Sequence, residues 1–237
     1  MTQVSIDING RRVERAAVLQ WEDRRIDAAA KKLGVTVSQG RTVDQRREEL
    51  LATKLELGAD EILRRLAGDV RRADRIARRA APLTKRRVVS SIEMFVPGAS
   101  ADDFVAWFQH ASAVDSAAML RACPDHFMIR DGVRGQEVLE TTGGSPFAAL
   151  FTIDYDDTSS LRTPADPQFS RQVAGVARAS DGTAVGGVRH QFRNTASGYH
   201  ARLSVEFPLL TLPTMASAHR WHLACEFSNW AEAAANA

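Results

Sequence analysis

The chain has 237 residues, 44% of them hydrophobic and 25% charged, and its formal net charge is +2. This length allows one large domain, or a main domain of ~150 residues with an appendage. Two cysteines are too few for a disulfide framework, and no apolar run reaches the ~20 residues of a membrane-spanning helix. Because the N-terminus also lacks a signal-peptide layout, we expect a soluble cytoplasmic protein.

Charge is distributed unevenly along the chain. Residues 1–87 hold 21 of the 31 Lys and Arg against 13 of the 29 Asp and Glu, a balance of +8. Residues 88–237 hold the other 10 against 16, a balance of −6, with no lysine and all six histidines. This asymmetry predicts two regions with different roles, a helical N-terminal appendage at 1–85 and a main domain at 86–237.

The N-terminal region begins with a strand pattern. Residues 4–8 alternate apolar and polar side chains and meet the turn pair Asn9-Gly10. Three helices follow in the prediction: one that ends at Gly34, one from about Thr42 to a break at Gly58, and one from about Asp60 to Ala80. We expect these helices to pack on the main domain or on a partner chain, because they are short for an independent core.

The third predicted helix is rich in arginine, which invites a nucleic-acid interpretation. Glu61, Asp69 and Asp74 interleave with its arginines, however, and no known DNA-binding motif is present. We therefore expect no nucleic-acid partner and no membrane partner. A solvated helix face or a homodimer contact made by the N-terminal helices fits the pattern better.

From residue 88 the pattern changes to one strand, two short helices, a series of strands and a last helix. The predicted strands are 88–96, 126–130, 136–142, 147–155, 186–194 and 199–207, with 171–178 ambiguous; the helices begin at about Ser100, Ser116 and Met215. This order is typical of the α+β START-like, or helix-grip, fold. There a curved antiparallel sheet wraps around the last helix and leaves an elongated ligand cavity.

The last helix carries His222 and Glu226 four residues apart, so their side chains lie on one face. An imidazole nitrogen and a carboxylate oxygen one turn apart can bind the same divalent metal ion. An ordinary polar pair on a helix surface is the alternative. Because both residues share the apolar stripe of Ala218 and Cys225, they are expected to be either metal ligands or buried polar residues with partners.

Four segments of the chain resemble the family of 2,4-diacetylphloroglucinol hydrolase and phloretin hydrolase, over about residues 88–235. They are Cys123-Pro-Asp-His126, Val138-Leu-Glu140-Thr-Thr-Gly-Gly, the stretch 188–203 that contains His190, and His222-x-x-x-Glu226-x-x-Asn-Trp-Ala. Members of this family are START-like zinc enzymes that hydrolyse the carbon–carbon bond between an acyl group and a phenolic ring.

The resemblance implies His126, Glu140, His222 and Glu226 as the metal ligands. Two imidazoles and two carboxylates form a sensible set for Zn²⁺ or another divalent metal. It further implies that His190 orients a substrate oxygen or donates a proton beside the metal, with Glu226 also taking part in catalysis. A purely structural role is the alternative for His190.

Several alternatives stay open at this point. Glu137 and Glu140 lie on opposite faces of one strand, so either can face inwards, and Asp154 is a reserve carboxylate ligand. The chain has no Gly-rich phosphate loop, no GxSxG and no HExxH, which argues against nucleotide chemistry, serine hydrolysis and common zinc proteases. The leading hypothesis is a zinc-dependent hydrolase that cleaves a carbon–carbon bond of an acylated phenolic or polyketide-like ketone. The second is a non-catalytic or cyclase-like START-domain protein that binds an apolar or polyketide ligand.

Overall fold

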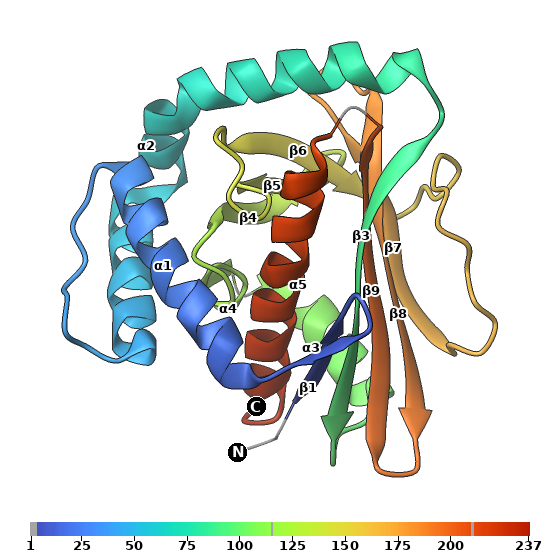
Figure 1. Ribbon diagram of the computed structural model, residues 1–237. Coiled ribbons are helices and arrows are strands. Elements are labelled where there is room, and N and C mark those ends of the chain that lie inside the picture. The colour runs from blue at the N-terminus through green and yellow to red at the C-terminus, as the bar shows by residue number, and fades with distance from the viewer. Residues whose placement is uncertain (1–3, 115, 210) are drawn as a thin grey trace.

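The computed structural model describes residues 4–114, 116–209 and 211–237 and has a mixed α+β fold, as the sequence predicts (Figure 1). Its helices are α1 (Arg15–Leu33), α2 (Val43–Ala80), the 3-10 turn η1 (Ala81–Leu83), α3 (Ala101–Val114), α4 (Ser116–Arg121) and α5 (Pro213–Ala234). Its strands are β1 (Ser5–Ile8), β2 (Arg11–Val13), β3 (Arg87–Pro97), β4 (His126–Gly132), β5 (Gly135–Glu140), β6 (Ala149–Asp154), β7 (Arg171–Arg178), β8 (Ala184–Thr195) and β9 (Gly198–Pro208).

All described strands belong to one antiparallel sheet of nine, in the order β2-β1-β3-β9-β8-β7-β6-β5-β4. The segment 171–178, ambiguous in sequence, is the strand β7. Alternate residues of the long central strands are buried, as on β3, where Ile92, Met94 and Val96 face the core. The helix α5 packs against this buried face, with α3 beside it (Figure 1).

The N-terminal helices begin and end at the residues that their sequences indicate. Gly34 caps α1 in the left-handed conformation, and Thr42 begins α2 with a capping box in which Gln45 takes part. The predicted break at Gly58 is a kink within α2, where φ is 72°. Only glycine adopts this conformation without strain, so the two predicted helices are the two arms of one bent element.

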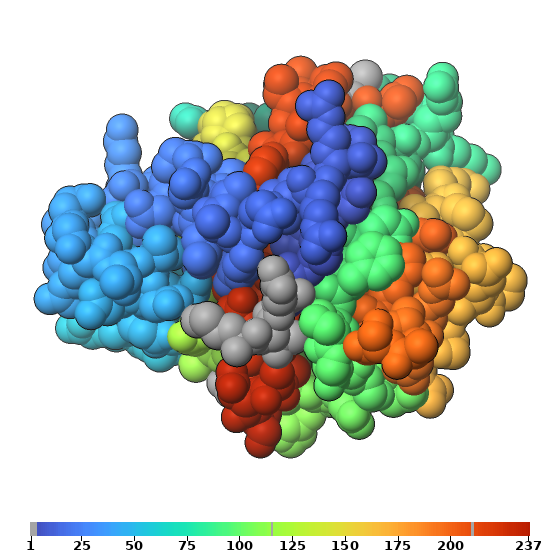
Figure 2. All heavy atoms as spheres, turned by 60° about the horizontal axis from the view of Figure 1, so that its bottom comes forward, coloured from blue at the N-terminus to red at the C-terminus, as the bar shows by residue number. Residues whose placement is uncertain are grey.

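The first 85 residues share their core with the rest of the chain. The strand β1 extends the sheet by pairing with β3, and its Ile6 belongs to the same hydrophobic cluster as Leu223 of α5. A second cluster joins α1 and α2 to the opposite face of β4 and β5, where Phe127 and Leu139 lie. Figure 2 shows the N-terminal segment (blue) lying across the C-terminal helix (red).

The helix α5 is consequently enclosed on several sides, and nearly every residue from 222 to 231 is buried. The sequence predicts one apolar stripe on this helix, and the structure buries residues on all sides of it over 222–231. The additional cover comes from α1, whose Arg15 donates hydrogen bonds to Asn229 and Glu232. None of the described helices is long and apolar enough to cross a membrane.

Candidate metal centre

The hairpin of β4 and β5 presents two of the predicted ligands side by side. His126 and Glu140 are direct partners across the two strands, and an irregularity in the pairing follows His126. Both side chains are buried. Strand alternation resolves the choice between the two acids: Glu140 faces inwards, whereas Glu137 faces outwards and pairs with Arg130.

The helix α5 supplies the other two predicted ligands. His222 and Glu226 are one turn apart, and both are buried between the hairpin and the helix. This position depends on Gly143, in the turn after β5, where a Cβ atom would lie 2.4 Å from the backbone nitrogen of His219. Because Gly143 has a φ of 61° and no side chain, the turn can approach the backbone of α5 closely.

The structure brings all four predicted ligands to one point. The Nε2 atoms of His126 and His222 are 3.2 Å apart. The Oε2 atom of Glu226 lies 3.1 Å from the first and 3.5 Å from the second, and the Oε2 atom of Glu140 lies 3.6 Å from both. In a tetrahedral zinc site with bonds of ~2.0–2.1 Å, neighbouring donor atoms are ~3.3–3.4 Å apart. The spacing of these donors fits such an ion.

Each imidazole is oriented by a contact on its far side. The Nδ1 atom of His126 lies 3.0 Å from the carbonyl oxygen of Met119 and donates to it, which leaves Nε2 as the free lone pair. The Nδ1 atom of His222 lies 3.7 Å from Oδ2 of Asp125 and 3.5 Å from the sulfur of Cys123. Both rings therefore point Nε2 towards the two glutamates.

Asp125 is fully buried and is itself held by two side chains. Arg25 of α1 donates to both of its carboxylate oxygens at 2.6–3.1 Å, and Thr141 donates to Oδ1 at 2.6 Å. Burial alone would raise the pKa of Asp125, but the contacts with His222 and Arg25 outweigh it and lower the pKa to about 2. Asp125 is therefore ionised at neutral pH.

Lys54 of α2 binds the backbone of the same segment, Cys-Pro-Asp-His. Its ammonium group donates to the carbonyl oxygens of Pro124 at 2.9 Å and His126 at 2.5 Å, and burial lowers its pKa to about 8. These contacts, like those of Arg25, were missed in the sequence analysis. Asp125 precedes His126 in Cys-Pro-Asp-His, so the sequence indicates that it lies beside the ligands. No neighbouring residue indicates its partner Arg25, which is 100 residues away in the chain.

The pKa shifts of the four ligands indicate that a positive charge among them is favourable. Burial raises the pKa of Glu140. Burial would also raise the pKa of Glu226, but the interactions with His222 and His126 outweigh burial and lower the pKa of this carboxyl group. Burial would also lower the pKa of His222, whereas the surrounding anionic groups, including both glutamates, raise it well above its ordinary value. A divalent cation bound at this point would supply the charge that protonated imidazole supplies otherwise.

Two neighbouring residues extend the set of possible ligands. His219 lies one turn before His222, with its Nδ1 atom 3.1 Å from the hydroxyl of Ser90, and it forms a second possible metal-binding group with Glu140 and His222. Cys123 forms another with His126 and His222. Burial raises the pKa of the Cys123 thiol well above its ordinary value, which makes it a poorer ligand than the carboxylates.

His190 lies in the middle of β8, facing the core, with its ring 4.8 Å from that of Phe227. Burial lowers its pKa to about 4, so it is neutral at pH 7, although the negative charge of Glu226 acts in the opposite direction. Its Nδ1 atom is buried and has no hydrogen-bond partner among the described residues. Buried polar atoms without partners are uncommon and point to a missing ligand or water.

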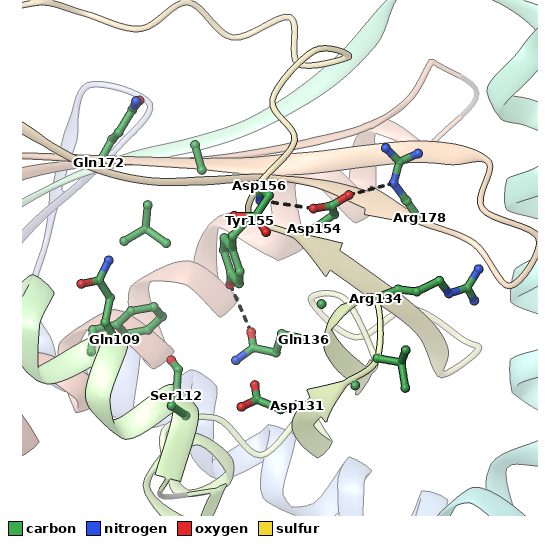
Figure 3. Close-up of a pocket in the computed structure, with 17 residues that line it drawn as sticks. Gln109, Ser112, Asp131, Arg134, Gln136, Asp154, Tyr155, Asp156, Gln172 and Arg178 are labelled. Atoms are coloured by element: carbon green, nitrogen blue, oxygen red, sulfur yellow. Dashed lines mark hydrogen bonds and ion pairs between the residues drawn. The ribbon is translucent and has the colours of Figure 1, made fainter.

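A pocket of about 840 Å³ opens between α3, the β4–β5 turn and the ends of β6 and β7 (Figure 3). None of the four clustered ligands lines it, and Tyr155 lies at its wall. The hydroxyl of Tyr155 donates to Oε1 of Gln136 at 3.1 Å, and burial together with Glu226 raises its pKa. The reserve ligand Asp154 also lies at this pocket, where Arg178 contacts it at 3.4 Å, and not in the cluster.

A comparison with models of protein families found no match to the chain, and a comparison with curated proteins found none either. The assignment of a function therefore has to be argued from the geometry of the cluster.

Proposed function

We propose that the protein is a zinc-dependent hydrolase that cleaves a carbon–carbon bond of an acylated phenolic or polyketide-like ketone. The observation that supports this proposal most is the convergence of His126, Glu140, His222 and Glu226, whose His–His and His–Glu donor atoms are 3.1–3.6 Å apart. Two imidazoles and two carboxylates suit zinc, although another divalent metal can occupy such a set.

The strand order supports a START-like helix-grip assignment for the main domain. From β3 onwards the order is β3-β9-β8-β7-β6-β5-β4, so the first strand of this region pairs with the last. Two short helices follow β3, and α5 packs on the face of the sheet that the strands curve around (Figure 1). The four proposed metal ligands and His190 lie on the same enclosed side, which fits this assignment.

Hydrolysis of an aryl ketone adds the oxygen of water to the carbonyl carbon, breaks the bond to the ring and returns a proton to the ring carbon. A bound zinc ion would polarise the carbonyl group and make water more acidic. Glu226, whose lowered pKa keeps it ionised at neutral pH, can accept a proton from water. His190 is neutral and carries one N–H group, with which it can hold a substrate oxygen. To protonate the ring carbon, it would first accept at its other nitrogen the proton that Glu226 took from water and then release a proton to that carbon.

The test is to load the purified protein with zinc and to follow 2,4-diacetylphloroglucinol and simpler acylphenols by chromatography. The proposal expects release of the free acid and the deacylated ring, and a loss of at least ~100-fold in Glu226→Gln. Absence of product from any acylphenol, with zinc bound in stoichiometric amount, would contradict the hydrolase and leave the metal site standing.

A second candidate is a non-catalytic or cyclase-like START-domain protein that binds a polyketide-like ligand. The observation that favours it is the pocket of about 840 Å³, which has the size of a small-molecule site but is not lined by the metal ligands. Tight ligand binding that is unchanged by removal of the metal, together with no turnover, would support this candidate.

A further inference from the structure

The pocket beside Tyr155 continues the enclosed face of the sheet that carries the candidate metal ligands. Gln136 and Glu140 are four residues apart on the same face of β5, which corresponds to about 13 Å along a strand. Phe108 and Val173 line the pocket and also belong to the hydrophobic cluster around α5. A ligand with its reacting group at the cluster therefore has to extend by about 13 Å, roughly the length of two linked rings, to reach this pocket.

The lining of the pocket is mixed: apolar surface from residues such as Phe108 and Val173 predominates, and polar and charged side chains stand among it. Gln109 and Ser112 of α3 and Gln136 of β5 point into it (Figure 3), and amide and hydroxyl groups of this kind both donate and accept hydrogen bonds. Arg178 is already engaged by Asp154 and by the carbonyl oxygen of Gly182 at 3.1 Å. Asp131, Asp154 and Asp156 outnumber Arg134 and Arg178 in the lining, so no net positive charge is available to hold an anionic ligand.

Tyr155 completes this surface. The residue as a whole is 38% exposed, and its hydroxyl group donates a hydrogen bond to Oε1 of Gln136. The Gln136 amide is thereby fixed with its Nε2 group towards the pocket (Figure 3). A partly exposed aromatic ring beside fixed amide and hydroxyl groups matches a compact group that has apolar C–H faces and several hydroxyls at its edge.

We infer that this pocket binds a neutral polyhydroxylated group, such as a sugar or polyol, carried by the substrate about 13 Å from the metal ligands. The inference rests on the proposed function for the location of the reacting ketone. It deepens that function by naming the substrate class: a glycosylated or polyol-substituted acylphenol, as opposed to one with a long apolar tail.

The experiment compares 4-acetylphenyl β-D-glucoside with 4-hydroxyacetophenone on the zinc-loaded full chain, by titration calorimetry and ligand-observed NMR. Two further hydrogen bonds of ordinary net strength predict that the glucoside binds about 10-fold more tightly. Gln109→Leu and Gln136→Leu should each remove most of this preference without changing the affinity for the aglycone. Gln168→Leu, outside the pocket lining, is the matched control and should keep the preference.

Equal or weaker binding of the glucoside, or a preference that survives in both pocket variants, would overturn the inference. Gln109 is exposed on α3, so its variant tests the pocket even if Gln136→Leu folds poorly. Zinc content is measured on the same samples. Loss of zinc binding would count against the proposed function, whereas a missing glucoside preference with zinc bound counts against the pocket alone.

Discussion

His190 is a single side chain whose environment makes a definite prediction about pH. Its pKa is about 4 in the folded chain and ~6.5 when unfolded, so between these values the unfolded state binds more protons. The stability associated with neutral His190 is therefore complete above pH 6.5 and is lost as the pH falls to 4, by up to about 3 kcal/mol. Urea unfolding of the wild type and His190→Gln across this range should show a shallower decline in the variant. Parallel declines would contradict the assignment.

Asp125 is a second residue with a separable role. Asp125→Asn should weaken zinc binding by about 10- to 100-fold, because it alters the group that orients His222. The matched control is Glu22→Gln, which disturbs another fully buried carboxylate–arginine pair, with Arg47 at 2.5 Å and 2.9 Å; Glu22 contacts Asn229 of α5 but none of the four ligands. Competition with a chromophoric chelator measures both affinities. A control that loses as much zinc affinity as Asp125→Asn would show that the effect is general destabilisation.

At the scale of elements, the approach of the turn after β5 to α5 is a critical contact. Gly143→Ala places a Cβ atom against the backbone at His219 and should cost more than about 3 kcal/mol, with loss of metal binding. Gly182→Ala is the control: its φ of 86° is equally unusual, but no atom lies within 4 Å, so only backbone strain of about 1–2 kcal/mol is expected. Thermal unfolding and zinc content distinguish the two. Similar losses in both variants would mean that the close contact does not matter.

Features set by neighbouring residues could be predicted from the sequence, whereas features set by distant contacts could not. Helix bounds at Gly34 and Thr42 depend on local capping, so they were predictable from neighbouring residues. His222 and Glu226 share a helix face for the same local reason. The rest depends on distant contacts: Arg25 meets Asp125 across 100 residues, and Asp154 lies at the pocket because β6 continues past the cluster. The hydrophobic pattern of a single segment does not indicate such contacts.

At the scale of the whole molecule, the N-terminal region is predicted to be required for a folded metal centre. Deletion of residues 1–85 removes the strand β1, eight of the twelve buried residues of the second hydrophobic cluster, and the contacts of Arg25 and Lys54. The truncated chain should lack a cooperative unfolding transition, as measured by near-ultraviolet circular dichroism. A stable truncated domain that binds zinc would contradict this and favour a separate role, such as the homodimer contact predicted for these helices.

The central claim is that His222, Glu226, His126 and Glu140 bind one divalent metal ion. The most direct measurement is elemental analysis of the purified protein, beside the double variant His222→Ala/Glu226→Ala and a control double variant, His110→Ala/Glu137→Ala, outside the cluster. The account predicts about one zinc per chain in the wild type and control and none in the first variant. At 100 times the dissociation constant, zinc should also stabilise the metal-free protein by ~2.7 kcal/mol, a rise in melting temperature of roughly 5–10 °C. A wild-type chain that carries no metal and does not gain stability with Zn²⁺ or Mn²⁺ would contradict the account.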